Sequence, residues 1–222
     1  MSRPEDKTSR TVLAVERVSK SGYYTLPTDE NTPHGLYMGR PIIGSGTRIA
    51  GGVYLGGHRR EAIVVHEHGV LAEAYSNLKS SVVRELPIYK RWLGRAPVQR
   101  ALAASFDYTR QLMPYDAEIA HEIRREHSDD RKVHLGRFVA LRGGVCRHQA
   151  LLAGFFVERM IDDKFLSGEV HVERNTTNAG THAWARYIPE QGESYIIDPA
   201  QDFVGTETAA QEAHWQYPPF EK

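Results

Sequence analysis

Cysteine, net charge and long apolar runs are all scarce in this sequence. A single cysteine among 222 residues excludes an intramolecular disulfide, which fits a reducing cytoplasm. The 28 basic and 28 acidic residues balance, so the chain has no electrostatic footprint for nucleic acid or for an anionic membrane. Charges interrupt the apolar runs before the roughly 20 residues of a membrane span, and the polar N-terminus lacks a secretory signal. We therefore expect a cytoplasmic protein with no nucleic-acid or membrane partner.

The first half of the chain carries mainly local signals. Alternation of apolar and polar residues predicts a strand over Thr11–Val18. Two further segments, Arg48–Leu55 and Glu61–His66, have the pattern of hairpin partners. Apolar residues three, four or seven apart then predict three helices over 72–126, interrupted near Pro87, Pro97 and Pro114.

Cys146, the only cysteine, lies where a helix should begin. Gly143 and Gly144 allow a tight turn just before it. Apolar residues follow at helical spacing, namely Ala150, Leu151, Leu152, Phe155, Phe156, Met160 and Ile161. The unpaired amides at a helix N-terminus favour a thiolate, so the sulfur should be a good nucleophile near neutral pH.

A histidine and an aspartate follow in an order suited to a base and its orienting group. His182 begins the alternating segment 181–188, and Asp198 ends the apolar run 194–197. Residues 189–193 between them indicate a hairpin turn, so the two strands should be antiparallel neighbours. The carboxylate can then face the imidazole and fix its tautomer, while the other ring nitrogen faces Cys146.

The order Cys146, His182, Asp198, with the local patterns Gly-x-Cys, His-Ala-Trp and Asp-Pro, resembles the transglutaminase-like superfamily of papain-type cysteine enzymes. The resemblance covers residues 135–204. It implies an α+β papain/transglutaminase-like core, in which a helix bearing the cysteine packs on an antiparallel sheet bearing the histidine and aspartate. It also implies that Cys146 forms a thioester with an acyl group from an amide, His182 protonates the leaving amine, and Asp198 orients His182.

The family commonly supplies an upstream side chain that helps to bind the oxyanion, and here no glutamine lies within a few residues of Cys146. Gln111 and Tyr115 are the nearest candidates. We assign the oxyanion role to the backbone amide of Cys146.

Three further residues are candidates for substrate binding. Arg147 and His148 follow the nucleophile and could lower its pKa, contact a substrate carboxylate, or simply point to solvent. Trp184 could stack on substrate, although its ring is better suited to buttress the His182 strand. The histidines offer no zinc spacing, because His66 and His68 lack a third ligand and His121 and His127 are six residues apart. We expect neither a metal nor a cofactor.

These features favour an enzyme that acts on an amide, peptide or isopeptide bond. A hydrolase, either peptidase or amidase, is slightly favoured over a transglutaminase-type amine acyltransferase, which would need a second amine substrate. The alternative is a catalytically degenerate domain that serves as a protein-binding or scaffolding module. We expect one compact unit in which residues 96–222 form the catalytic core and residues 1–95 have an unassigned role. The oligomeric state stays open.

Overall fold

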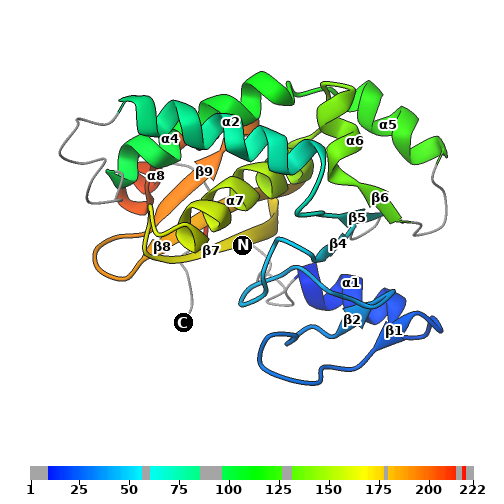
Figure 1. The fold of residues 1–222 in the computed structure, drawn as a ribbon. Coiled ribbons are helices and arrows are strands. Elements are labelled where there is room, and N and C mark those ends of the chain that lie inside the picture. Colours follow the sequence, from blue (N-terminus) through cyan, green and yellow to red (C-terminus); the bar gives the residue numbers. More distant parts are fainter. Residues whose placement is uncertain are drawn as a thin grey trace, which may run out of the picture.

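The structure is a computed structural model that describes residues 10–56, 61–85, 97–126, 132–177, 180–213 and 217–218. It is a mixed α and β fold with several sheets (Figure 1). The described helices are α1 (Arg10–Val18), α2 (Val70–Glu85), α4 (Val98–Leu112), α5 (Ala117–Glu126), α6 (Leu135–Ala140), α7 (Cys146–Asp162), α8 (Glu207–Glu212) and the short 3₁₀ helix η1 (Pro199–Gln201). The strands are β1 (Tyr24–Thr25), β2 (Leu36–Tyr37), β3 (Arg40–Pro41), β4 (Val53–Leu55), β5 (Ala62–Val64), β6 (Lys132–His134), β7 (Gly168–Thr177), β8 (Gly180–Pro189), β9 (Tyr195–Asp198) and β10 (Phe203–Thr206).

A four-stranded antiparallel sheet, ordered β10-β9-β8-β7, forms the platform of the fold. Because side chains alternate along a strand, one face presents Val172, Ala183, Ala185 and Ile197 to the main hydrophobic core. The other face presents Trp184 and its neighbours to a smaller cluster. Both faces are therefore covered.

Helix α7 packs against this sheet on the main-core face. All of its residues from Ala150 to Val157 are buried, because the sheet covers one side and α4 the other (Figure 1). Gly154 permits the close approach, since a Cβ there would lie 2.7 Å from Ile49 Cδ1 and 3.2 Å from Val172 Cγ2.

The helices expected over 72–126 are present in the described part of that stretch as α2, α4 and α5. Pro97 is the N-cap residue of α4, and Pro114 lies between α4 and α5. The break expected near Pro87 lies outside the described residues. None of the helices that the structure describes is long and apolar enough to cross a bilayer.

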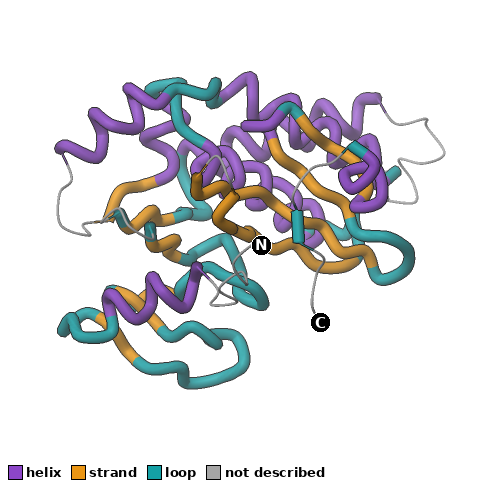
Figure 2. The backbone as a smooth tube through the Cα atoms, turned by 180° about the vertical axis from the view of Figure 1, so that it is seen from behind, coloured by secondary structure: helices purple, strands orange, loops and turns teal. Residues whose placement is uncertain are grey.

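The strand predicted over Thr11–Val18 is wrong, because this segment belongs to helix α1. Thr11, Ala14 and Val18 are the residues of α1 that the fold buries, and they are three and four positions apart. That spacing places them on one helical face, so the helical period prevails over the apparent alternation. Helix α1 and strands β1, β2 and β3 form a small lobe to one side of the main layers (Figure 2).

The predicted hairpin partners do pair, since Val53 lies opposite Val64 in the antiparallel β4–β5 ladder. Strand β6 then joins β5 in parallel and so connects the two halves of the chain. One hydrophobic cluster contains residues from both halves, from Ile43 to Ile197. The boundary proposed at residue 95 falls outside the described residues and stays a prediction.

Candidate active site

Cys146 is the first residue of α7 and is partly buried. The preceding turn is tightly packed, since a Cβ on Gly144 would lie 2.7 Å from Met113 Sδ and one on Gly143 2.5 Å from Ile119 Cδ1. Glycine at these two positions lets the chain turn sharply into the helix. The sulfur therefore sits at the helix N-terminus, where unpaired amides and the helix dipole favour negative charge.

The structure brings His182 between Cys146 and Asp198. The imidazole Nε2 lies 2.5 Å from Asp198 Oδ2, and the ring also forms a hydrogen bond with the Cys146 thiol. Because Asp198 occupies Nε2, Nδ1 is the nitrogen left for the sulfur. The three side chains form one continuous chain of contacts.

His182 and Asp198 are diagonal neighbours rather than directly opposite. Ala185 pairs with Ile197 in the β8–β9 ladder, so continuing this register by one residue places Trp184 opposite Asp198. His182 is two positions away on the same face, a distance that long side chains can bridge. The longer imidazole side chain therefore reaches back to the carboxylate.

Asp198 is fixed by three donors. Its Oδ2 accepts hydrogen bonds from His182 and from the Tyr217 hydroxyl at 2.7 Å, while Oδ1 accepts the backbone N–H of Gln201 at 3.2 Å. Asp198 is fully buried. Tyr217 was not among the residues predicted from sequence. The only sequence feature that marks Tyr217 is that it is an aromatic residue in a proline-rich segment near the end of the chain.

The electrostatics of the site favour a thiolate and an imidazolium. Burial opposes ionisation of Cys146, but the hydrogen bond from His182 and the positive charges of His182 and Arg147 outweigh it, so the pKa of the thiol is lowered. Burial also opposes the charge on His182, but its hydrogen bonds to Asp198 and Cys146 raise the pKa to about 9. The backbone of Ala183 adds a further hydrogen bond to the sulfur. Together these interactions favour the charged form of the thiol, which is the more nucleophilic form.

Arg147 is not a freely exposed cation. Its Nε donates to Glu61 Oε2 at 2.6 Å, and its side chain is only 13 % exposed. Glu61 is itself buried, and although burial opposes its charge, His148 and Arg147 hold the pKa of the carboxyl at about 2. Glu61 was not singled out from sequence, because the contact joins residues 86 positions apart.

His148 cannot contact a substrate in this structure, contrary to the role given to it above. The ring is fully buried and stacks on Phe138 with 3.8 Å between ring centroids. Its Nδ1 accepts the N–H of the N-cap residue Val145, and its Nε2 donates to Glu61 at 3.2 Å. Burial, followed by repulsion from Arg147, lowers the pKa of His148 to about 4. It is a neutral residue that fixes the start of α7.

Trp184 is also buried and acts as a buttress. Its Nε1 donates to Glu173, and its ring stacks on His182 at 6.1 Å and meets Tyr217 edge-on at 5.1 Å. A tryptophan that is 1 % exposed offers almost no surface to a substrate. Of the two readings offered by the sequence, the geometry favours packing.

Tyr115, one of the two oxyanion candidates, lies beside the turn that leads into Cys146. It forms a parallel bridge with Gly144 and is 59 % exposed. Gln111 is exposed as well, and its backbone carbonyl accepts a hydrogen bond from Arg142. The backbone amide of Cys146 remains our candidate for the oxyanion site.

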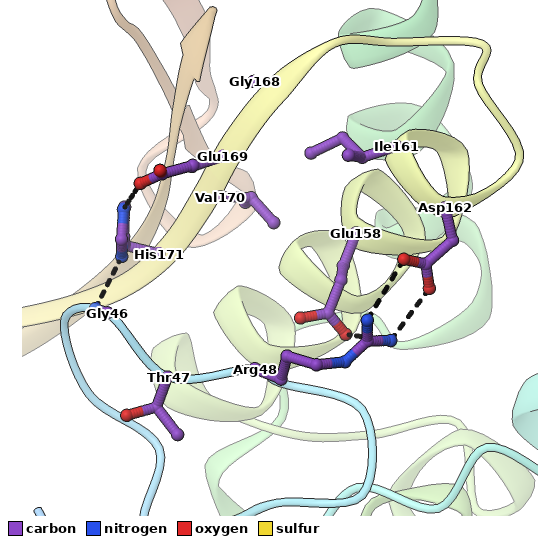
Figure 3. A pocket seen from close by; sticks show the side chains of 10 residues that line it. All are labelled: Gly46, Thr47, Arg48, Glu158, Ile161, Asp162, Gly168, Glu169, Val170 and His171. Carbon is purple, nitrogen blue, oxygen red and sulfur yellow. Dashed lines mark hydrogen bonds and ion pairs between the residues drawn. The ribbon is translucent and has the colours of Figure 1, made fainter. Parts of the chain in front are cut away.

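A separate pocket of about 280 Å³ lies at the opposite end of α7 (Figure 3). Its polar side chains hold the loop 44–52 in place. Arg48 binds Asp162 through two hydrogen bonds of 3.2 and 2.8 Å, and Glu158 accepts the backbone N–H groups of Ile49 and Ala50, both at 2.7 Å. His171 Nδ1 accepts the N–H of Gly46 at 3.0 Å. These contacts give the pocket a structural role.

Within the described residues, histidine, cysteine, aspartate and glutamate side chains form no group of three or more that could hold a metal ion. His66 instead packs against His134, with 4.4 Å between ring centroids.

No protein-family model matches this chain, and neither does any curated protein. Among solved structures, the chain is similar to Legionella pneumophila LapG, with a TM-score of 0.42 and 17 % identity over 64 % of this chain and 71 % of LapG. For EGTA-treated Legionella pneumophila LapG the TM-score is 0.41, again at 17 % identity, over 64 % of this chain and 69 % of LapG. Both likenesses are distant, and neither bears on the activity of this chain.

Proposed function

We propose that this protein is a cysteine-nucleophile enzyme of the papain and transglutaminase-like type, acting on an amide, peptide or isopeptide bond. Cys146, His182 and Asp198 are the proposed catalytic residues. The observation that carries the proposal is the continuous contact from the Cys146 thiol through His182 to the buried, triply hydrogen-bonded Asp198.

The chemistry follows from this geometry. The Cys146 thiolate attacks the amide carbonyl, and the backbone amide at the helix start stabilises the oxyanion. His182, as imidazolium, protonates the leaving amine, so that a thioester remains on the sulfur. A water molecule, or a second amine substrate, then takes the acyl group, with His182 accepting its proton. Of the two outcomes we favour hydrolysis of a peptide or protein substrate.

The pH dependence of Cys146 alkylation by iodoacetamide tests this proposal. Since the chain has one cysteine, intact mass reports on a single site. The wild-type protein should react rapidly below the ordinary thiol pKa, and His182→Ala should lose this reactivity. A slow reaction that is the same in both proteins would instead favour the binding or scaffolding module.

His171→Ala is a matched control, because it removes another largely buried imidazole, at the distant pocket (Figure 3). Its alkylation profile should follow that of the wild type. Hydrolysis and acyl transfer are then distinguished by offering a peptide substrate with and without a primary amine and identifying the products by mass.

A further inference from the structure

Two arginine side chains, Arg147 next to Cys146 in the chain and Arg174 on β7, contain guanidinium nitrogens that have no acceptor among the residues that the structure describes. The nitrogens are Nη2 of Arg147 and both Nε and Nη2 of Arg174, all shielded from solvent. Each arginine uses another nitrogen for a protein contact, Arg147 with Glu61 and Arg174 with the backbone carbonyl of Leu55. A buried donor without a partner is unfavourable, so three of them together favour an acceptor supplied from outside the chain.

Both arginines reach the same end of the β4–β5 hairpin. Leu55 pairs with Ala62, and Glu61 is the residue just before Ala62. The backbone N–H of Gly56 donates to the carbonyl of Glu61 at 2.7 Å, which closes this end of the ladder. The carbonyl held by Arg174 and the carboxylate held by Arg147 are therefore close neighbours.

The same two arginines flank Cys146 and His182. Arg147 follows Cys146 directly, and Arg174 pairs across β7 and β8 with Ala183, whose backbone forms a hydrogen bond with the Cys146 sulfur. The next pair along the ladder joins Asn175 to His182. Arg174 also lies over the Tyr54 ring, 4.7 Å from its centroid, so its guanidinium plane is held by packing.

The charges at this point do not cancel. Glu61 neutralises one guanidinium and its other contact is the neutral His148, whereas the described contacts of Arg174 are an uncharged carbonyl and an aromatic ring. Among the described contacts, the charge of Arg174 therefore has no anionic partner and is left for a ligand. A planar carboxylate matches the fork of guanidinium N–H donors better than a neutral amide does.

We propose that Arg147 and Arg174 form a carboxylate-binding subsite beside Cys146, and that the substrate carries a carboxylate close to the amide bond that is attacked. This inference rests on the proposed function, because it names the substrate class of the same site. The carboxylate could belong to an acidic side chain or to a chain terminus.

The test compares iodoacetate with iodoacetamide, two reagents of similar size of which only the first is anionic. In each reaction the Cys146 sulfur displaces iodide and forms a carbon–sulfur bond. The ratio of the two rate constants for glutathione gives the intrinsic preference of a thiolate. Wild-type protein should exceed that ratio about tenfold or more, the effect of one charge-assisted hydrogen bond.

Arg174→Met should bring the ratio back towards the glutathione value, and Arg174→Lys should restore part of the preference. Arg48→Met is the matched control, because it removes the same charge at the far end of α7 and should leave the ratio unchanged. If Arg174→Met does not fold, the wild-type ratio remains decisive without a variant. A wild-type ratio equal to that of glutathione overturns the subsite.

The two proposals fail in different ways. Rapid, His182-dependent alkylation by iodoacetamide with no preference for iodoacetate would remove only the subsite, whereas slow, His182-independent alkylation would remove the proposed function. Two further reagents identify the source of the carboxylate. N-iodoacetylglycine presents a terminal carboxylate, and the N-iodoacetyl derivative of aspartate α-amide presents one on a side chain. The favoured reagent identifies the source, and no preference for either over N-iodoacetylglycinamide counts against the subsite.

Discussion

Replacing Asp198 by asparagine isolates the role of its charge. The amide has nearly the same shape, and its one oxygen can still accept either from Tyr217 at the Oδ2 position or from the Gln201 N–H at the Oδ1 position, so most of the local structure should persist. What it lacks is the negative charge 2.5 Å from His182 Nε2. The hydrogen bond to this carboxylate is the first of the interactions that raise the pKa of His182 against the opposing effect of burial, and its charge raises the pKa further.

The expected size of the effect on the thiolate–imidazolium pair follows from the contact between Asp198 and His182. A hydrogen bond to a charged group contributes about 1.5–3 kcal/mol, so the equilibrium for the thiolate–imidazolium pair should fall about 10- to 150-fold. The direction of both pKa changes follows from the loss of the negative charge. His182 stays protonated up to its raised pKa of about 9 in the wild type, whereas in Asp198→Asn the pKa of His182 falls and that of Cys146 rises. The pH window in which the ion pair exists therefore narrows from both sides.

Ultraviolet absorbance of the thiolate and the rate of iodoacetamide alkylation, both followed across pH, measure this change on the single cysteine. Asp202→Asn is the matched control, because Asp202 is 71 % exposed and its carboxylate contacts Arg110 outside the site. A pH profile for Asp198→Asn that coincides with the wild-type profile would refute the role of the Asp198 charge.

Two other predictions concern stability. Tyr217→Phe removes a donor to a buried carboxylate, so it should lower the free energy of unfolding by about 1–3 kcal/mol. Each kcal/mol lost should lower the Tm by about 2–4 °C. Tyr23→Phe is the calorimetric control, because Tyr23 is exposed in the wild type. An unchanged Tm would remove Tyr217 from the site. Wild-type stability should fall as pH decreases from 6.5 towards 4, because the unfolded chain protonates His148 before the folded state, whose His148 pKa is about 4, can do so. This loss of stability should reach at most about 3 kcal/mol. When stability is measured by urea unfolding at several pH values, His148→Gln should lack this part of the pH dependence. The same pH dependence in both proteins would contradict the assignment of His148 as neutral.

The predictable parts of this structure are those encoded by neighbours in sequence. Two glycines before Cys146 and an apolar period after it were enough to place the start of α7, and alternation placed strands around His182 and Asp198. The diagonal offset between His182 and Asp198 could not be predicted from the sequence, because the register of the ladder depends on the whole hairpin.

The unpredicted parts depend on contacts between distant segments. Tyr217 and Glu61 acquire their roles only when the chain end and the β4–β5 hairpin fold onto the site. Helix α1 was misread because a short segment with mixed polarity fits both periods, and only the burial of Thr11, Ala14 and Val18 decides between them. His148 was misread for a related reason, since a polar residue gives no sign of burial until Glu61 and Val145 supply both of its hydrogen bonds.

The hairpin end at Glu61 brings the N-terminal half of the chain into the proposed active site. Cys146, Arg147 and His148 are consecutive, and the roughly 100° between successive residues of a helix sends their side chains in different directions. Cys146 meets His182 on the sheet, while Arg147 and His148 both meet Glu61. The carboxylate of Glu61 thus fixes Arg147, whose charge helps to lower the pKa of the neighbouring thiol, and holds His148 as the neutral ring that receives the Val145 N–H. Residues before position 95 therefore contribute to the position and the charge of the residues around Cys146, although the sequence signature of the site lies entirely after it.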